Sequence, residues 1–290
     1  SDVCSSDLGT FSNKLALNQA NDVASLIKPS GYTTKTITVD TKSKSLRELE
    51  NGLLKGAFEV FVIPASFLPA RLNDTLELIA FTKREGVNDV LLNRNKVSLT
   101  AGLTIGTNSP RRIAFLKHFY PKTKIVSVPE NIESRIKKLQ AGNYGLIISH
   151  SDAKRLEVEN LIAEQIETSY FVPGVGQASI AVVCHKKLAF DKKEILQRWV
   201  NDEETEDCIR TERSFLKTFS AASNIPVFGY ANYEGGLVTL KAGVIGANGK
   251  QVIKAKRTST IAECKELGKK LAEEVLQNGG VDILKTARRS

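Results

Sequence analysis

The sequence predicts an α/β protein with more than one domain, and three observations lead to this prediction. Stretches with the apolar spacing of amphipathic helices alternate with short apolar runs typical of buried strands, an order that implies helices layered on sheets. The chain has 290 residues, 41% of them hydrophobic, so it can bury a sizeable core, and its length favours about two or three domains. In the final third the pattern changes to three strands and one long helix, which indicates a separate α+β domain.

The first part of the chain is expected to contain two helices and two strands. Apolar residues recur at helical spacing from Leu15 to Ile27, and the Pro-Ser-Gly sequence at residues 29–31 ends that helix. Thr33 to Val39 alternates like a strand. The next helix is expected from Leu46 to Leu54, and Phe58 to Ile63 is a continuous apolar run of the kind found in buried strands.

The middle of the chain repeats this order, and the end does not. The expected elements are a strand at 103–106, a helix from Ser109, a strand at 124–126, a helix at 132–139 and a strand at 146–148. After a crossover at 173–177, a strand at 179–184 and a helix at 192–200 follow. The final third is expected to form strands near 227–230, 237–240 and 252–255, and then a helix at 261–276.

The composition argues against several classes of protein. No window approaches the ~18 to 20 apolar residues of a membrane span, and the chain opens without a signal-peptide pattern, so a cytoplasmic protein without membrane contact is expected. The four cysteines and three histidines show no ligand-like spacing, so neither a disulfide framework nor a metal site is expected. Because the sequence has no methionine, we interpret Ser1 to Leu8 as a foreign leader and give Cys4 no role.

The net charge of +9 is compatible with three interpretations. A solvated basic face is the simplest of them, and we prefer it to nucleic-acid binding because no RNA-binding or helix-turn-helix pattern accompanies the charge. The third is a cationic environment for a polycarboxylate substrate. Nucleic-acid binding would be favoured if the basic residues gathered on one surface outside the substrate site.

A candidate anion site lies at residues 107–112, whose sequence is Thr-Asn-Ser-Pro-Arg-Arg. Ser109 is a suitable N-cap, and Pro110 is preferred at the first helical position. A helix start presents free N–H groups and the positive end of its dipole, and the forks of Arg111 and Arg112 suit bidentate carboxylate contacts. Without further information, an ordinary cap with two solvent-facing arginines explains the same residues.

Several ordered blocks resemble the porphobilinogen deaminase (hydroxymethylbilane synthase) family. The segment from Thr211 to Ala231 resembles the segment in which that family anchors its cofactor, E-R-x-F-L-x-x-x-x-G-G-C-x-x-P-[IV]. Residues that match this pattern are Glu212, Arg213, Phe215, Leu216, Pro226 and Val227. Further matches are residues 106–112 to G-T-x-S-x-R-R, 175–177 to V-G-Q, 154–156 to K-R-L and 15–19 to L-A-L-x-Q.

The resemblance implies a fold of three domains. Two α/β domains, similar to periplasmic binding proteins, would enclose a cleft, at residues 9–84 with 178–198 and at 85–177. Residues 199–290 would form a C-terminal α+β domain that carries the cofactor loop. The implied reaction is the condensation of porphobilinogen, with loss of ammonia, into the linear tetrapyrrole hydroxymethylbilane, a step of haem biosynthesis.

The chain departs from the family at the positions that carry the chemistry. Phe67 stands where the family has its catalytic aspartate, Ser66 where it has a lysine, and Ser223 where it has the cysteine that holds a dipyrromethane. A phenyl ring cannot exchange a proton, and a serine without an adjacent base is a weak nucleophile. Two arginine positions of the family are Phe11 and Pro129. We therefore expect no cofactor and an unmodified Ser223.

The resemblance also implies a set of carboxylate-binding residues, and it leaves the activity open. The set comprises Thr107, Ser109, Arg111, Arg112, Arg135, Arg155 and Gln177. Our preferred hypothesis is a monomeric, catalytically impaired family member that binds a pyrrole carboxylate or regulates a paralogue. The alternatives are an active synthase that uses a noncovalently bound primer and a basic nucleic-acid-binding protein. Whether the protein is an enzyme is not decided by the sequence.

Overall fold

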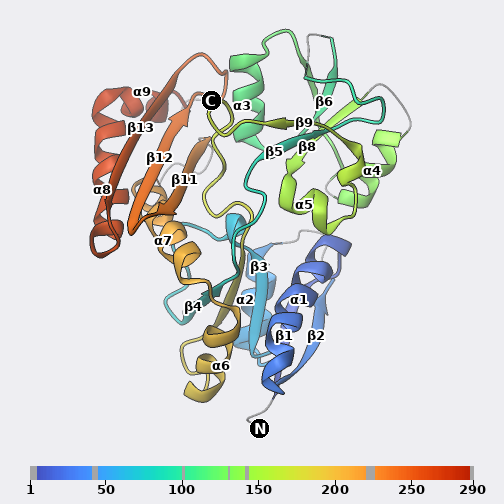
Figure 1. The fold of residues 1–290 in the computed structure, drawn as a ribbon, viewed down its shortest axis with the longest axis vertical. Coiled ribbons are helices and arrows are strands. Elements are labelled where there is room, and N and C mark those ends of the chain that lie inside the picture. The colour runs from blue at the N-terminus through green and yellow to red at the C-terminus, as the bar shows by residue number, and fades with distance from the viewer. Residues whose placement is uncertain are drawn as a thin grey trace. The chain divides into compact units, whose positions relative to one another are not determined.

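The computed structural model describes residues 5–40, 45–99, 102–129, 131–140, 144–219 and 226–287. In these ranges it contains two five-stranded sheets, one three-stranded sheet and the helices that cover them (Figure 1). The predicted α/β class is thereby confirmed. The chain divides into two compact units, Ser1–Glu85 with Ala178–Glu206, and Gly86–Gln177 with Asp207–Ser290. The three domain boundaries implied by the resemblance stay a prediction.

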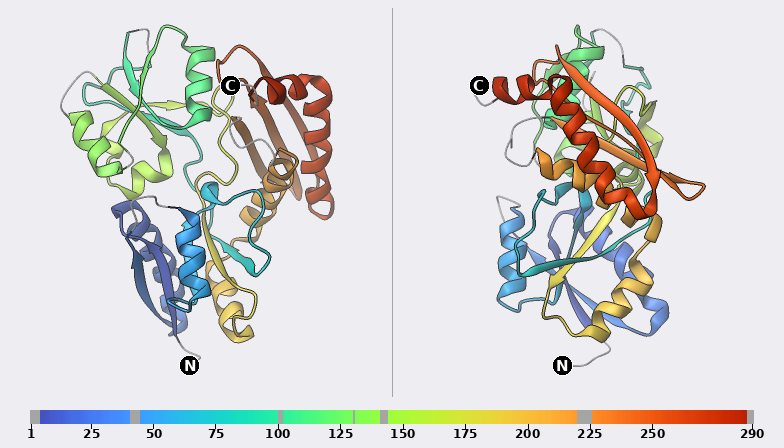
Figure 2. Two further views of the ribbon diagram at one scale, coloured as in Figure 1. Left: turned by 180° about the vertical axis from the view of Figure 1, so that it is seen from behind. Right: turned by 90° about the vertical axis from the view of Figure 1, so that its left-hand side faces the viewer.

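The first unit is built on a five-stranded mixed sheet in the order β2-β1-β3-β10-β4. Its strands are β1 (Ser5–Phe11), β2 (Thr33–Val39), β3 (Val60–Pro64), β4 (Leu76–Phe81) and β10 (Ile180–His185). The first three are parallel, and β10 runs antiparallel to β3 and β4. Its helices are α1 (Lys14–Ile27), α2 (Leu46–Leu54) and α6 (Phe190–Val200). Buried residues of α1 and α6 pack on one side of the sheet, and Figures 1 and 2 show α2 on the opposite side.

The interpretation of Ser1 to Leu8 as a foreign leader stays a prediction, and strand β1 begins within these residues, at Ser5. Leu8 is fully buried, and Ser6 is buried with its hydroxyl 2.6 Å from that of Tyr32. The strand pairs with β2 along its whole length and with β3 at Leu8 and Gly9. The sequence signal for this strand is weak because Ser5 and Ser6 are polar, and the hydroxyl of the buried Ser6 finds its partner in Tyr32, directly before β2. Cys4 lies outside the described residues.

The second unit contains two sheets. A mixed one has the order β7-β6-β8-β5-β9, with β5 (Asp89–Leu92), β6 (Thr104–Gly106), β7 (Lys124–Val126), β8 (Tyr144–Ser149) and β9 (Ile162–Ile166). Its helices are α3 (Pro110–Phe119), α4 (Ile132–Gln140) and α5 (His150–Arg155). The other sheet is antiparallel, in the order β11 (Val227–Glu234), β12 (Leu237–Ile245) and β13 (Val252–Thr260). It packs with α7 (Glu203–Thr218), α8 (Cys264–Val275) and α9 (Val281–Ala287).

The predicted helices and strands are found near their expected positions, and the additional ones have weak patterns. The elements that were not expected are the strands β1, β4, β5 and β9 and the helices α5, α7 and α9. Strand β5 is only four residues long and begins with an aspartate, so its apolar run is too short to distinguish from a turn. Helix α7 opens with Glu203, Glu204 and Glu206, and these acidic residues suit the first turn of a helix.

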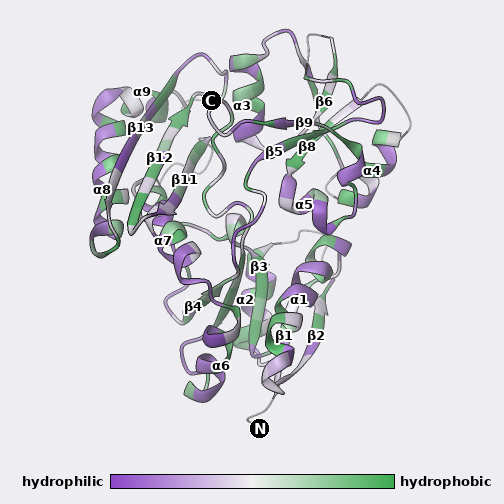
Figure 3. Ribbon diagram, viewed as in Figure 1, coloured by the Kyte–Doolittle hydropathy of each residue, from purple (hydrophilic) through white to green (hydrophobic). Residues whose placement is uncertain are grey.

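Hydrophobic residues concentrate on strands such as β3 and β8, and hydrophilic residues recur along the helices (Figure 3). The buried residues of α1, α6 and α8 pack with buried strand residues, as expected for amphipathic helices. Within the ranges that the structure describes, no helix has the length and apolar character needed to cross a bilayer.

Candidate functional site

The start of α3 is organised by hydrogen bonds of its own loop. Ser109 caps the helix, with its hydroxyl accepting from the N–H of Arg112, and the buried Thr107 hydroxyl accepts from the N–H of Ser109. Asn108 makes two bonds to the backbone of Val128, at 2.8 and 2.9 Å. The predicted N-cap is therefore present, and the loop that precedes the helix is fixed against the chain after β7.

Arg111 and Arg112 converge on one buried carboxylate, that of Asp89 at the start of β5. Arg111 donates from Nη2 to Asp89 Oδ2 at 2.7 Å. Arg112 donates from Nε and Nη2 to Oδ1 at 3.0 and 2.8 Å. Asp89 is fully buried, and the side chains of Arg111 and Arg112 are 8% and 15% exposed. Both forks thus hold a carboxylate of the protein itself.

Gln177 completes this cluster from the crossover segment. Its Oε1 accepts from Arg111 Nη2 at 3.0 Å, and its Nε2 donates to Asp89 Oδ1 at 3.1 Å and to the carbonyl of Val87 at 2.7 Å. Two further guanidinium nitrogens donate to backbone carbonyls. Arg111 Nη1 donates to the carbonyl of Val172, and Arg112 Nη1 donates to the carbonyl of Ile147. The structure therefore brings Arg111, Arg112 and Gln177 together, as the resemblance implies.

The charges of the cluster set its protonation. Burial alone would raise the pKa of Asp89, but the charges and hydrogen bonds of Arg111 and Arg112 outweigh burial and hold that pKa below its usual value. Burial lowers the pKa of Arg111, although the charge of Asp89 opposes this shift. Arg111 and Arg112 lie in the first turn of α3, where they repel each other and where the positive end of the helix dipole disfavours cations. The buried carboxylate of Asp89 offsets the repulsion and the dipole.

A second carboxylate lies nearby, on α5. Burial raises the pKa of Asp152, and a hydrogen bond from Ser149 together with the charges of Arg112 and Arg155 partly opposes the increase. Arg155, the last residue of α5, therefore acts on the same group of charges as Arg112. Arg135 lies on α4, where its Nε donates to the carbonyl of Pro129. The carboxylate-binding roles of Arg135 and Arg155 stay predictions.

The positions that depart from the family pattern lie in different surroundings. Phe67 ends the short turn Ala65–Phe67 after β3, and it is 66% exposed beside the exposed Ser66. Phe11 ends β1 and is buried. Phe11 is thus part of the core of the first unit, and of these two phenylalanines it is Phe67 that presents its ring to solvent. Ser223 lies outside the described residues.

Two acidic residues to which the sequence analysis gave no functional role are central to the second unit. Asp89 is one. Glu212 is the other, a fully buried side chain of α7 whose Oε2 accepts from the N–H of Gly176 and whose Oε1 accepts from that of Ala231, both at 2.7 Å. Glu212 thus fixes the crossover segment next to Gln177. The sequence contains a signal for Glu212, because this residue matches the family pattern. Asp89 can be recognised in the sequence only as an acidic residue before an apolar run.

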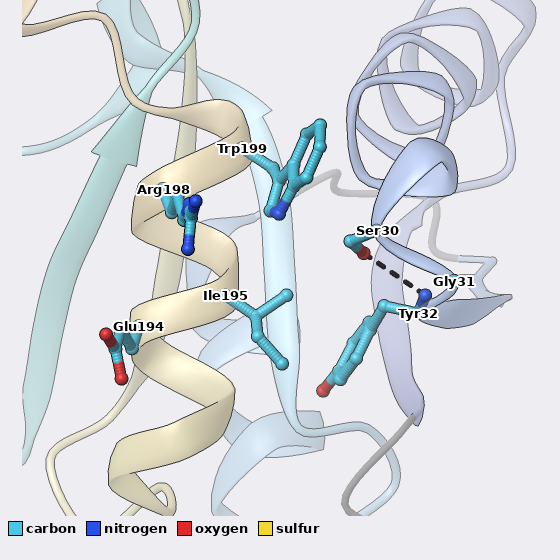
Figure 4. A pocket seen from close by; sticks show the side chains of 7 residues that line it. All are labelled: Ser30, Gly31, Tyr32, Glu194, Ile195, Arg198 and Trp199. Atoms are coloured by element: carbon cyan, nitrogen blue, oxygen red, sulfur yellow. Dashed lines mark hydrogen bonds between the residues drawn. The ribbon is translucent and has the colours of Figure 1, made fainter.

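A separate pocket lies in the first unit, between the end of α1 and α6. It has a volume of about 430 Å³ and is lined by Ser30, Gly31, Tyr32, Glu194, Ile195, Arg198 and Trp199 (Figure 4). Its walls contain none of the residues assigned to carboxylate binding. Within the described part of the chain, no group of histidines, cysteines and carboxylates could hold a metal ion.

Curated relatives match nearly the whole chain. A porphobilinogen deaminase of Desulfosudis oleivorans is 32% identical over 97% of this chain and 97% of its own. The one from Cytophaga hutchinsonii is 30% identical over 96% of this chain and 95% of its own. Among solved structures, the methionine binding protein MetQ has a TM-score of 0.46 at 12% identity, over 77% of this chain and 97% of its own.

Two family models match consecutive parts of the sequence. Residues 7–193 match the model described as "Porphobilinogen deaminase, dipyromethane cofactor binding domain", and residues 207–277 match that of the C-terminal domain. The first model names a dipyrromethane cofactor for the family, so the expectation that no cofactor is involved is wrong. Among the described residues, the ring of Phe67 suits the apolar faces of such a group but cannot accept hydrogen bonds from pyrrole N–H groups as a carboxylate does. From these matches we conclude that the chain belongs to the porphobilinogen deaminase family.

Proposed function

We propose that this protein binds pyrrole carboxylates of the porphobilinogen type and condenses them slowly compared with an ordinary hydroxymethylbilane synthase. The observation that carries the proposal is Phe67, an exposed phenyl ring directly after a buried strand where the family has its aspartate. Loss of ammonia and the developing cation require a group that moves a proton and offsets positive charge. A phenyl ring provides neither, and losing general acid catalysis costs on the order of 10²- to 10⁴-fold in rate.

Carboxylate recognition is assigned to the start of α3. Arg111 and Arg112 have the geometry for bidentate contacts, and the dipole of α3 adds to their charge. Asp89 already accepts hydrogen bonds from both arginines. The carboxylate of a ligand must therefore share these donors with Asp89 or displace it. Arg112 is the more exposed of the two and has two donors on a single Asp89 oxygen, so it is the one expected to turn toward a ligand.

The turnover test compares four proteins in a porphobilinogen consumption assay, namely wild type, Phe67→Asp, Ser223→Cys and the double variant. We expect wild-type turnover at least about 100-fold below that of the Desulfosudis oleivorans relative. Ser223→Cys alone should not raise it, because Phe67 remains. Phe67→Leu serves as the matched apolar control. Intact mass of each protein reports whether it carries a dipyrromethane. Wild-type turnover equal to that of the relative would contradict the proposal.

Ligand binding is tested separately by calorimetry with porphobilinogen. Arg112→Gln removes the more exposed fork and leaves the Arg111–Asp89 pair in place, and we expect it to weaken binding about tenfold, the effect of losing ~1.4 kcal/mol. Lys122→Gln, an exposed residue in the turn after α3, is the control with the same change in charge. If Arg112→Gln is folded and binds as wild type does, the carboxylate site lies elsewhere.

A further inference from the structure

The face of the three-stranded sheet that points away from α8 carries a cluster of lysines. In one cross-strand row, Tyr230 of β11 lies opposite Lys241 of β12, which lies opposite Lys256 of β13. Side chains two residues apart on a strand share a face, so Lys254 belongs to the same surface. We call this surface the lysine face and define it by Lys241, Lys254, Lys256, Tyr230, Thr239 and Thr258.

The opposite face of the sheet is the hydrophobic one. Val238 and Leu240 of β12 pack there with Leu267 and Leu271 of α8. Figures 1 and 2 show α8 alongside this sheet. The basic residue of β13 on that side, Arg257, donates to Glu274 of α8 at 2.6 Å. On the lysine face, none of the three lysines forms an ion pair with any described residue. Their charges are thus uncompensated.

The arrangement is electrostatically unfavourable for the protein alone. Like charges directly opposite each other destabilise a sheet, and Lys241 faces Lys256 across the ladder. Burial, and then the charges of Lys254 and Lys256, lower the pKa of Lys241. Lysines on an edge strand are a common protection against aggregation, and this accounts for Lys254 and Lys256 on β13. It does not account for Lys241, which lies in the central strand.

Aromatic and hydroxyl groups adjoin the lysines. Lys241 Nζ lies 3.4 Å from the carbonyl oxygen of Ser169, and the next residue, Tyr170, is 52% exposed. The hydroxyls of Thr239 and Thr258 are 2.8 Å apart in the row next to Lys241. Two residues along a strand span about 7 Å, so Lys254 and Lys256 present two cations in line. Lysines in a row beside the exposed ring of Tyr170 form a surface that suits phosphates together with an unstacked base.

We propose that the lysine face binds single-stranded nucleic acid, with phosphates on Lys241, Lys254 and Lys256 and a base against Tyr170. An acidic peptide is the less favoured occupant, because a peptide strand would pair with the backbone edge of β13 and would leave Lys241 in the central strand unused. The proposal does not rest on the proposed function, because the carboxylate cluster around Asp89 shares none of these residues.

The test is fluorescence anisotropy with a labelled 20-nucleotide oligo(dT), titrated at several salt concentrations. The variant Lys241→Gln, Lys254→Gln, Lys256→Gln removes the cluster. Its matched control, Lys265→Gln, Lys269→Gln, Lys270→Gln, removes three exposed lysines from α8 with the same change in net charge. We expect the first variant to bind at least tenfold more weakly than the control. The slope of log K against log salt should fall by about 2, since each phosphate contact contributes about 0.7.

Variants of Tyr170 test base stacking, and melting temperatures test whether the lysine-face variant is folded. Tyr170→Ala should weaken binding several-fold without changing the salt slope, whereas Tyr170→Phe should bind as wild type does. Melting temperatures should show the lysine-face variant at least as stable as wild type, because it removes a repulsion. The proposal is overturned if both triple variants lose affinity equally, if Tyr170→Ala has no effect, or if labelled polyglutamate binds as tightly as oligo(dT).

Discussion

Asp89 shows how much one buried carboxylate can organise. It is fully buried and accepts hydrogen bonds from Arg111, Arg112 and Gln177. Two cations around one anion leave the cluster with a net positive charge in a site that excludes water, where Coulomb interactions are strong. The same excess charge makes the cluster suited to a second carboxylate.

Replacing Asp89 by asparagine is expected to lower the free energy of unfolding by about 3 to 5 kcal/mol at pH 7, because two buried guanidinium groups lose their anion. Urea titration of wild type and Asp89→Asn measures the difference. Glu77→Gln is the control, since it removes a more exposed carboxylate from an ion pair with Lys193, where a small effect of about 0 to 1 kcal/mol is expected. A loss for Asp89→Asn no larger than that of the control would contradict the assignment.

The pH dependence of this difference has a definite sign. Because the pKa of Asp89 is lowered in the folded protein, its contribution is fully present above its unfolded value of about 3.9 and is lost as the pH falls through the folded pKa. The pKa of Asp152 is raised, so its contribution falls as the pH rises from about 3.9 through the folded pKa. The gap between wild type and Asp89→Asn should therefore narrow only below about pH 4.

Cys184 is expected to be unreactive in the folded protein. It is fully buried in β10, and burial raises its pKa to about 12, so the nucleophilic thiolate is scarce at pH 8. Mass spectrometry after iodoacetamide treatment at pH 8 should find this residue unmodified in buffer and modified in urea. Alkylation in buffer at the rate seen in urea would show that β10 opens readily.

At the scale of elements, the contact between α7 and α8 depends on a glycine. A Cβ built on Gly268 would lie 2.3 Å from the carbonyl oxygen of Thr211 and 2.8 Å from the N–H nitrogen of Phe215. Both obstacles are backbone atoms, which cannot rotate away as a side chain could. The two helices therefore approach more closely than any larger residue would allow.

Gly268→Ala is expected to destabilise the protein by about 1 to 3 kcal/mol, because α8 must shift away from α7. Helix propensity alone would predict the opposite, an increase in the free energy of unfolding of about 1 kcal/mol, because alanine is favoured over glycine in a helix. Chemical denaturation of this variant and of Lys269→Ala, an exposed position on the same helix, provides the comparison. A stabilised Gly268→Ala would mean that the helices are not in close contact.

At the scale of the whole molecule, the chain forms two units that each have a core. Leu8, Val62, Val182 and Leu196 belong to the core of the first unit, whereas Phe115, Phe171 and Phe228 are buried in the second. The chain passes between the units after Glu85, Gln177 and Glu206. Units with separate cores can unfold as separate cooperative blocks.

Calorimetry should therefore resolve two unfolding transitions. Leu8→Ala, which leaves a cavity worth about 2 to 5 kcal/mol, should lower the temperature of one transition, and Gly268→Ala should lower that of the other. Leu54→Ala, at an exposed position of α2, is the control for the first unit. One transition that both variants shift equally would show that the units unfold together.

The sequence by itself determined the class of fold, most of the helices and strands, and the family. These follow from local patterns, such as the apolar spacing of α1 and the Ser109-Pro110 start of α3, which act over a few residues along the chain. It also predicted a carboxylate-binding role for Arg111, Arg112 and Gln177, and the structure places these three residues around Asp89. Strand β1 was not expected because it contains two serines, and the partner of the buried Ser6 hydroxyl, Tyr32, is distant in the sequence.

Only the tertiary structure decided which groups those residues contact. Asp89 reaches Arg111 and Arg112 from a strand more than twenty residues away, and Gln177 reaches Asp89 and Arg111 from the crossover. Glu212 likewise joins Gly176 to Ala231. The register of β11, β12 and β13 gathers Lys241, Lys254 and Lys256 on one face. Such contacts depend on packing between distant segments, for which local sequence patterns carry no information.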